Sequence, residues 1–368
     1  MTIFLSVKKP TLILDEEKAK KNLSTLYSKI TNQKIRFRPH FKTHQSNEIG
    51  EWFRQTGINA ITVSSVEMAQ YFSENNWNDI LIAFPVNILQ IEEIVQLSKK
   101  IELSLLFEDV VPVKFLDLHL SRPVKGWIKI DSGANRCGLN FHQIEKILEL
   151  AETMKSSKNI HLQGLLTHAG HTYLSNNPAE IIEIYERSVK ELNELRNGLH
   201  AKLSDDLEIS VGDTPSASLV KNFGMVDELR PGNFLFYDVQ QYVANVCHLE
   251  DIAVCVACPV VAIHPEKKEV VIFGGAIHFS KDTHAWKHNQ PTFGLVTLPN
   301  ATGWDHQVYG YVKSLSQEHG VLAFPNGIPD SIKIGSIVCV LPAHSCLTVQ
   351  AMRQYMTLDG EVITTMLV

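Results

Sequence analysis

The sequence lacks an excess of positive charge. Its 34 Lys and Arg residues are outnumbered by 40 Asp and Glu residues, which gives a formal net charge of −6. Nucleic acids and anionic membrane surfaces attract proteins through clustered cationic side chains. We therefore expect neither of them as a partner.

Long apolar runs are also missing. No stretch approaches the roughly 20 residues that a membrane-spanning helix needs. The apolar run within residues 1–10 is too short for a secretory signal, and its lysines come after it. We expect a cytoplasmic protein.

Cysteine is too sparse for a disulfide framework, with six residues in a chain of 368. Cys255 and Cys258 have the spacing of half a zinc ribbon or of a redox pair. They lie, however, in the apolar run 252–263, and no second pair follows at ribbon spacing. Because the run is typical of a buried strand, we interpret both cysteines as small core residues.

Internal repeats are absent, so the domain organisation follows from apolar periodicity. Eight strand-like runs alternate with amphipathic stretches of helical period, at residues 35–42, 60–65, 79–85, 102–108, 126–131, 162–168, 207–212 and 228–237. This alternation is the pattern of a TIM (β/α)8 barrel, which we predict over residues 11–240.

The pattern changes after about residue 240. Strand-like runs replace helical stripes at 269–273, 292–298, 306–314 and 336–341, and Asp359-Gly360 indicates a hairpin within 355–366. These features predict a second, mostly β domain over residues 241–368, with residues 1–10 as a possible extra strand.

Lys42 stands in a segment rich in Arg and His, and no acidic residue occurs between Glu17 and Glu48. Cations without a compensating carboxylate lower the pKa of a lysine amine and make it nucleophilic. A Schiff-base lysine needs this property, and the same field suits an anionic cofactor. A solvated basic surface explains the segment equally well.

Polar and glycine-rich segments follow the later predicted strands, at 131–138, 167–173, 212–216 and 230–233. Loops at the C-terminal ends of barrel strands form the active face, so these segments and Lys42 should share one rim. Backbone amides of glycine-rich turns bind phosphate, although turns also use these residues for conformational reasons. Together the segments suggest a pyridoxal phosphate site.

His344 and Cys346 are two residues apart in a strand-like context, so we expect their side chains on one face. An imidazole and a thiolate there could share a metal ion, preferably zinc. Two protein ligands would leave positions open for water and substrate. Ordinary strand content is the alternative.

Six motifs resemble, in order, those of the D-threonine aldolase and D-serine dehydratase family: Arg-Pro-His-Phe-Lys-Thr-His at 38–44 and the segments 131–138, 167–173, 212–216, 228–238 and 342–346. The resemblance implies the alanine racemase-like fold, pyridoxal phosphate and a homodimer. It also implies that Lys42 forms the Schiff base, and we hypothesise that the freed Lys42 amine acts as general base. Residues implied for the phosphate are Tyr173, Thr214, Gly232 and Asn233.

The resemblance further implies that Arg136 or Arg230 faces the pyridine ring and that His168 is catalytic or contacts the substrate, and we also expect His168 among the residues that bind the cofactor. For His171 a structural role is favoured. Family dehydratases tend to carry a His-X-Cys motif like His344 and Cys346, whereas family aldolases tend to carry aspartate in place of the cysteine. We therefore expect elimination from a β-hydroxy D-amino acid, with D-serine giving pyruvate and ammonia.

Three alternatives remain. Retro-aldol cleavage of D-threonine to glycine and acetaldehyde would use the same residues. Amino-acid racemisation would need a second base, for which Tyr309 and Tyr311 are the candidates, although neither matches the racemase motif. A non-catalytic pyridoxal phosphate carrier would have no use for residues 240–368.

Overall fold

The computed structural model describes residues 3–287 and 290–366 and divides into two compact units. The barrel unit comprises residues 25–42 and 49–232. The β unit comprises residues up to 24, residues 43–48 and the chain from 233 onward. The chain passes from the barrel unit to the β unit at residue 233, and the sequence pattern predicts this change at about residue 240.

Eight parallel strands form the barrel unit, as the sequence predicts. Their order is β2-β10-β9-β8-β6-β5-β4-β3, and a parallel bridge between His40 and Thr62 nearly closes the sheet. The strands are β2 (Arg36–Phe37), β3 (Ala60–Val63), β4 (Asp79–Pro85), β5 (Glu102–Phe107), β6 (Val124–Asp131), β8 (Ile160–Thr167), β9 (Glu208–Val211) and β10 (Glu228–Leu229), and the short β7 (Leu139–Asn140) pairs with β6.

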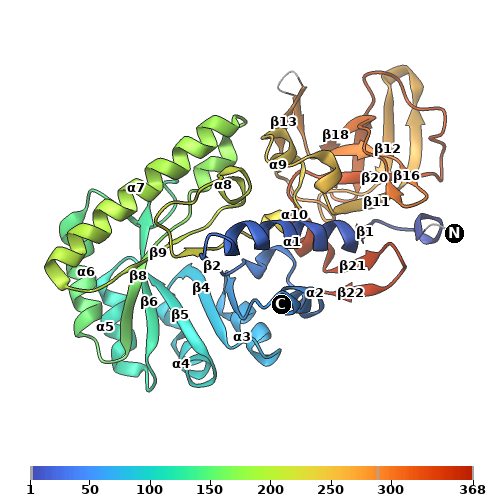
Figure 1. The fold of residues 1–368 in the computed structure, drawn as a ribbon. Helices are drawn as coiled ribbons and strands as arrows, with labels where there is room; N and C mark the ends of the chain where they lie inside the picture. Colours follow the sequence, from blue (N-terminus) through green and yellow to red (C-terminus); the bar gives the residue numbers. More distant parts are fainter. Residues whose placement is uncertain (1–2, 288–289, 367–368) are drawn as a thin grey trace. The chain divides into compact units, whose positions relative to one another are not determined.

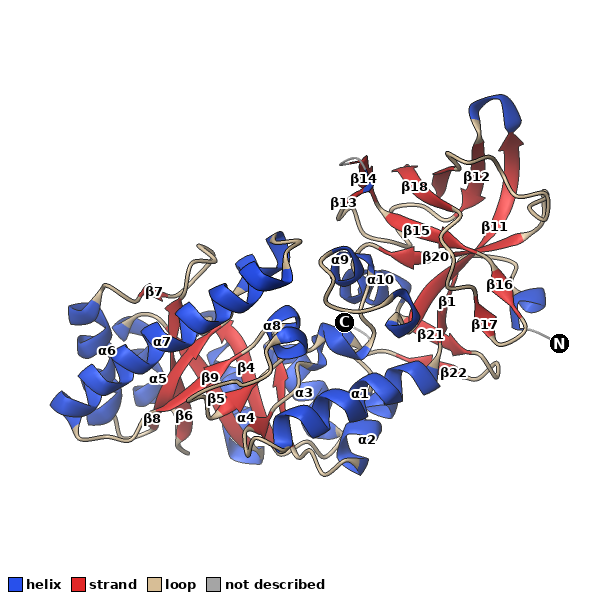
Figure 2. Cartoon of the chain, turned by 45° about the horizontal axis from the view of Figure 1, so that its top comes forward, coloured by secondary structure: helices blue, strands red, loops and turns tan. Residues whose placement is uncertain are grey.

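Helices cover the outer face of these strands (Figure 1, Figure 2). Ser65, Asp109 and Asn177 begin α3, α5 and α7 by accepting a hydrogen bond from a first-turn N–H. The helices that lie in the barrel unit, or end in it, are α1 (Glu16–Thr31), α2 (Asn47–Gln55), α3 (Val66–Glu74), α4 (Ile91–Lys100), α5 (Val110–His119), α6 (Ile144–Ser156), α7 (Pro178–Leu203) and α8 (Thr214–Leu219), with 3-10 turns η2 (Phe41–Thr43), η3 (Ile88–Gln90) and η4 (Gly170–Leu174).

Two strands are shorter than predicted. The run 35–42 is strand only in β2, and the run 228–237 is strand only in β10. Pro39 and Pro231 lack an N–H and cannot continue a ladder as donors. Lys42 consequently lies in η2, a turn beyond the strand, instead of ending the strand as expected.

The interior of the barrel contains a layer of apolar side chains. Leu81, Leu106, Trp127 and Leu166 come from β4, β5, β6 and β8 and form one buried layer. Gly126 allows α6 to approach β6, because a Cβ there would lie 2.2 Å from a terminal carbon of Met154. A filled interior leaves the strand ends as places for polar chemistry.

The β unit contains a nine-stranded sheet of order β12-β19-β18-β15-β20-β11-β1-β21-β22, in which β12 also pairs with β11 (Figure 2). Only the β1–β21 pairing is parallel. The strands are β1 (Thr11–Leu14), β11 (Val254–His264), β12 (Glu269–Phe273), β15 (Gly294–Thr297), β18 (Gly310–Leu315), β19 (His319–Ala323), β20 (Ile337–Pro342), β21 (Gln354–Thr357) and β22 (Val362–Thr364). The predicted mostly β region is confirmed, but its N-terminal strand is β1, and residues 3–10 contain no strand.

Small elements complete the β unit. Cys255 and Cys258 lie in β11 and are fully buried, which confirms that they are core residues. The remaining elements are β13 (His284–Trp286), β14 (Gln290–Thr292), β16 (Pro299–Asn300), β17 (Gly303–Trp304), α9 (Val239–Val243), α10 (Ser345–Met352), η1 (Ile3–Ser6), η5 (Asn233–Leu235), η6 (Leu249–Asp251) and η7 (Pro265–Lys267). No helix in the described residues is long and apolar enough to cross a membrane.

Candidate active site

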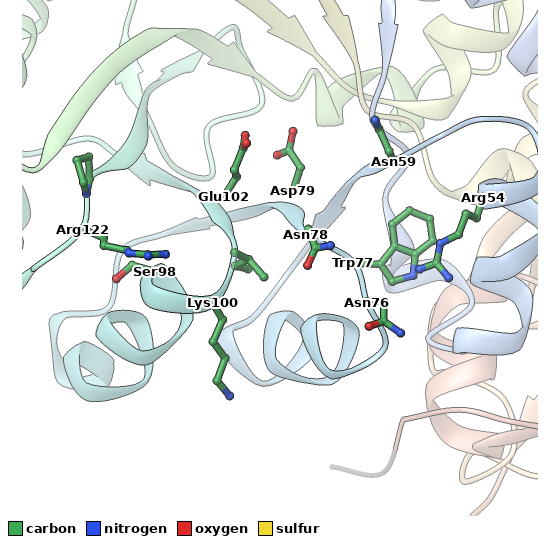
Figure 3. Close-up of a pocket in the computed structure, with 12 residues that line it drawn as sticks. Arg54, Asn59, Asn76, Trp77, Asn78, Asp79, Ser98, Lys100, Glu102 and Arg122 are labelled. Carbon is green, nitrogen blue, oxygen red and sulfur yellow. The ribbon is translucent and has the colours of Figure 1, made fainter.

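A cavity of about 850 Å³ opens at the N-terminal ends of the barrel strands (Figure 3). Asn59, Asp79 and Glu102 line it at the starts of β3, β4 and β5, and the Arg54 guanidinium lies 4.5 Å from the centroid of the Trp77 ring. None of the predicted site residues lines this cavity. Lys42 and His168 instead lie beyond the C-terminal ends of β2 and β8, which puts the candidate active site at that end of the barrel.

A cationic cluster surrounds Lys42 in the barrel unit. Burial, followed by the charge of Lys42, holds the pKa of His168 well below its usual range. The same two causes, in the same order, act on His40, and Arg230 adds to them. Arg136 is exposed, but its charge also lowers the pKa of both imidazoles. The two histidines are therefore neutral rings in a positive field.

Two arginines of the Lys42 segment do not contribute to this field as the sequence suggests. The Arg38 guanidinium donates to Glu228 at 2.7 Å and to Asp79 at 2.7 Å, and Arg36 donates to Glu228 at 2.6 Å. Carboxylates remote in sequence thus compensate both charges. The positive charges that act on His40 and His168 beside that of Lys42 come instead from Arg136, Arg230 and Lys129.

Arg230 is buried and is held by acceptors inside the barrel. Its Nε donates to Ser210 Oγ at 2.6 Å and its Nη2 to the carbonyl of Thr167 at 2.6 Å. Burial lowers the pKa of the Arg230 guanidinium to about 10. Gly212 leaves room for this side chain, since a Cβ there would lie 3.2 Å from Arg230 Nη1.

Tyr173 and Thr214, which the resemblance assigns to a phosphate, are neighbours. The backbone N–H of Thr214 donates to the Tyr173 hydroxyl at 3.0 Å. Asp213 begins α8 by accepting from the backbone of Ser216 at 2.7 Å. Backbone amides and a phenol at a glycine-containing turn suit an anionic group.

His168 has a defined orientation. Its Nδ1 is hydrogen-bonded to the carbonyl oxygen of Gly212, and its ring centroid lies 6.0 Å from that of Tyr173. His171 packs against Gly133, and neither of its ring nitrogens has a hydrogen-bond partner among the described residues. The structure thus ties His168, but not His171, to the turn that precedes α8.

His344 and Cys346 lie in the β unit at the start of α10, so the strand-like context expected for them is wrong. Asp238 is the cause, because its Oδ2 accepts from the backbone N–H of Ser345 at 3.0 Å and helps to begin the helix. The two side chains still meet. Burial opposes protonation of His344, but the hydrogen bond to Cys346 and the charges of Cys346 and Asp238 outweigh it and raise the pKa of His344 to about 10.

Asn233, expected at the phosphate, points its amide at other groups of the β unit. Its Nδ2 donates to Asp238 at 2.7 Å, to Ser345 Oγ at 3.0 Å and to Cys346 Sγ at 3.7 Å. Gly232, the residue before it, is partly exposed at the end of the barrel unit. The side chain of Asn233 therefore supports the position of Cys346.

Asp282 is a site residue that sequence reasoning missed. Its Oδ2 lies 2.7 Å from His344 Nδ1. A carboxylate on one ring nitrogen orients the other nitrogen toward a metal. The only signal in the sequence was an acidic residue in a loop of unknown direction, 62 positions before the histidine.

The donor set fits both expected groups. The His344 imidazole is hydrogen-bonded to the Cys346 side chain, so a nitrogen and a sulfur donor suited to a soft divalent metal already lie together. Within the described residues, His344 and Cys346 are not part of a set of three or more His, Cys, Asp and Glu side chains placed to hold a metal ion. The cationic cluster around Lys42 fits a phosphorylated aldehyde.

The chain belongs to the alanine racemase N-terminal domain family. That family model matches residues 14–239, and the putative serine dehydratase domain model matches residues 253–358. The relationship that the motifs predict is therefore confirmed, and so is the alanine racemase-like fold.

Known relatives cover nearly the whole chain. D-threo-3-hydroxyaspartate dehydratase of Delftia sp. (strain HT23) is 26% identical over 98% of this chain and 97% of its own. Its structure matches with a TM-score of 0.90 and 25% identity over 99% and 98% of the two chains, and a variant is known in a metal-free form. D-serine dehydratase of Dictyostelium discoideum is 27% identical over 96% of this chain and 93% of its own.

The structure of D-threonine aldolase from Filomicrobium marinum shares the fold. It has a TM-score of 0.83 and 20% identity, and the match covers 99% of this chain and 96% of that one. One architecture thus holds dehydratases and an aldolase, so the chemistry must follow from the site residues.

Proposed function

We propose that this chain is a pyridoxal phosphate-dependent and metal-assisted lyase that dehydrates β-hydroxy D-amino acids, with D-serine giving pyruvate and ammonia. The observation that carries the proposal is the imidazole–thiol pair of His344 and Cys346, which Asp282 and Asn233 support. The class agrees with the near full-length relatives, which are named as dehydratases.

Lys42 is the proposed attachment point of the cofactor. When bound, pyridoxal phosphate supplies electron withdrawal from the substrate α-carbon. The Lys42 amine would then serve as the general base that takes the substrate α-proton. Arg230 and Arg136 contribute positive charge in place of a carboxylate, which disfavours a protonated pyridine nitrogen. Loss of the β-hydroxyl therefore needs assistance from elsewhere.

His344 and Cys346 are the proposed metal ligands. A divalent metal there would polarise the substrate β-hydroxyl as a Lewis acid. The soft thiolate favours zinc over magnesium or manganese. Tyr173, Thr214, Gly232 and Asn233 remain the proposed phosphate residues, although the Asn233 amide group is engaged elsewhere. We also propose a cytoplasmic homodimer that binds neither nucleic acid nor membrane.

Retro-aldol cleavage is the second candidate, and one observation favours it. Because the Gly212 carbonyl only accepts hydrogen bonds, His168 Nδ1 carries the proton and Nε2 is left as an acceptor. Such a nitrogen could take the β-hydroxyl proton of D-threonine. Racemisation is less favoured, since the Tyr309 hydroxyl donates to Asp305 at 2.9 Å and this bond raises its pKa.

Product analysis tests these functions. Purified protein is incubated with D-serine or D-threonine, with L-serine as control, and pyruvate, glycine with acetaldehyde, and racemised substrate are assayed. Lys42→Ala should lose the visible absorbance of bound cofactor. Cys346→Ala should keep that absorbance and lose pyruvate formation. Full activity after verified removal of metal would contradict the role of His344 and Cys346.

A further inference from the structure

His40 is fixed where the barrel nearly closes. Its backbone N–H donates to the carbonyl of Pro231 at 2.9 Å, and its neighbour Pro39 accepts from the N–H of Thr62 at 2.9 Å. The parallel bridge between His40 and Thr62 connects the segment after β2 to β3. The backbone of His40 is therefore held by both flanking chain segments, while its side chain stays partly exposed.

The ring of His40 carries its proton on Nε2. Nδ1 accepts a hydrogen bond from the backbone N–H of Lys42 at 3.4 Å, so this nitrogen bears no proton. Burial, then the charges of Lys42, Arg230, His168 and Arg136, keep the pKa of His40 well below its usual range, and the ring is neutral. The remaining proton must sit on Nε2.

His168 has the opposite tautomer. Its Nδ1 donates to the carbonyl of Gly212, which leaves Nε2 unprotonated. Gly170 lies beside this nitrogen, since a Cβ there would be in van der Waals contact with it at 3.5 Å. Lys42 acts electrostatically on both rings. The cluster thus presents one neutral imidazole as donor and one as acceptor.

We propose that His40 is a ligand-binding residue whose Nε2–H donates a hydrogen bond to an anionic oxygen of the bound ligand, while His168 Nε2 acts as acceptor. The oxygen belongs either to the carboxylate of the amino-acid substrate or to the phenolic group of the cofactor. No acceptor for His40 Nε2 occurs in the part of the chain that the structure describes. This inference rests on the proposed function for the identity of the ligand.

The first experiment measures the tautomers directly. Protein labelled with ¹⁵N in histidine is studied by long-range ¹H–¹⁵N NMR before and after addition of pyridoxal phosphate, with His40→Gln to assign the signals. We expect His40 to have a protonated Nε2 and a bare Nδ1, and His168 the reverse. A protonated Nδ1 in His40, or rapid exchange between its tautomers, would overturn the inference. Failure of cofactor binding would leave this result intact.

The second experiment distinguishes the loss of the His40 hydrogen-bond donor from the loss of the shape of its side chain. His40→Leu removes the N–H and His40→Gln keeps an amide donor, while His161→Leu makes the same change at an exposed position at the start of β8. The His40→Leu variant should bind the ligand roughly 10-fold to 100-fold more weakly, because it has lost a hydrogen-bond donor to a charged group. The His40→Gln variant should regain most of the lost affinity, and His161→Leu should bind the ligand like the unmodified protein.

The two readouts identify the oxygen. An effect on the dissociation constant of pyridoxal phosphate, from absorbance titration, assigns it to the cofactor; an effect on KM for D-serine alone assigns it to the substrate carboxylate. If folded His40→Leu bound pyridoxal phosphate and D-serine as tightly as the unmodified protein, the inference would be wrong, and the proposed function would be unaffected. Equal loss in the leucine and glutamine variants would also contradict it. If both variants misfold, the tautomer spectrum of the unmodified protein decides.

Discussion

Thr43 Oγ1 lies 3.4 Å from Cys346 Sγ, although the two residues are 303 positions apart. Thr43 directly follows Lys42 in the sequence. Cys346 also accepts from the Asn233 amide at 3.7 Å and is hydrogen-bonded to His344. Hydroxyl and amide donors stabilise a thiolate, which is the form of cysteine that binds a metal. The segment that carries the proposed cofactor lysine thus also supplies a support for the proposed metal ligand.

Replacing Thr43 by valine tests this support. Thr43→Val keeps the shape of the side chain but removes the hydroxyl from Cys346 Sγ. Because residues that orient metal ligands typically contribute a factor of 10–100 in affinity, we expect zinc to bind about 10-fold more weakly. Competition with a chromophoric chelator measures this. Thr153→Val, on the surface of α6, is the matched control, and equal affinities in the two variants would contradict the prediction.

Asp282→Asn tests the orientation of His344. The carboxylate bonded to His344 Nδ1 makes the imidazole a better metal ligand, and the neutral amide should weaken zinc binding by about 10-fold. The rate of zinc loss to excess chelator should increase by a similar factor. Asp330→Asn, at another exposed carboxylate of the β unit, should behave like the unmodified protein. Identical rates in all three proteins would rule out a role for Asp282.

Glu228 should be important for stability. It is fully buried between Arg36 and Arg38, and despite burial these charges lower its pKa to about 2. Glu228→Gln leaves Arg38 buried with less compensation, which should reduce the free energy of unfolding by about 3–5 kcal/mol at neutral pH. Glu102→Gln, which breaks an exposed pair with Lys125, should cost under about 1 kcal/mol. Urea unfolding measures both.

The contribution of Glu228 also has a defined pH dependence. Since its folded-state pKa lies below the ordinary value of 4.5, its stabilisation is complete above about pH 4.5 and is lost as the pH falls toward 2. The difference in unfolding free energy between the unmodified protein and Glu228→Gln should therefore shrink on acidification. If this difference in unfolding free energy stayed constant from neutral pH down to about pH 2, the ionised pairing of Glu228 with Arg36 and Arg38 would be contradicted.

Asp213 should have the opposite dependence. Burial raises its pKa to about 6 from 3.8, so the folded state retains a proton that the unfolded chain has lost between these values. Stability therefore falls as the pH rises through this window, by up to about 3 kcal/mol. Asp213→Asn keeps an oxygen for the Ser216 amide and should remove the slope. Its new amide could lack a partner, but that cost is independent of pH.

The slope is measured by urea unfolding at several pH values. Asp109→Asn is the control, because Asp109 also begins a helix by accepting a first-turn N–H but is exposed. The difference between the unmodified protein and Asp213→Asn should change across the window, and that for Asp109→Asn should not. Parallel curves for both variants would show that Asp213 titrates normally.

The sequence by itself determined the succession of elements. Alternating strand and helix periods predicted all eight barrel strands, because burial of one face imposes a local repeat that needs no knowledge of distant residues. The apolar run around Cys255 and Cys258 likewise predicted a core strand and not a metal site. The predicted strand lengths were wrong at Pro39 and Pro231, because a proline has no N–H to donate to a neighbouring strand even within an apolar run.

Only the tertiary structure decided the partners of the polar groups. Arg36 and Arg38 looked uncompensated in sequence, yet Glu228 and Asp79 pair with them across the sheet. Asp238 turned an expected strand at His344 into a helix start, and Asp282 joined that histidine from a distant loop. Hydrogen bonds and ion pairs depend on distances of a few ångströms between remote segments, and no local repeat encodes those distances.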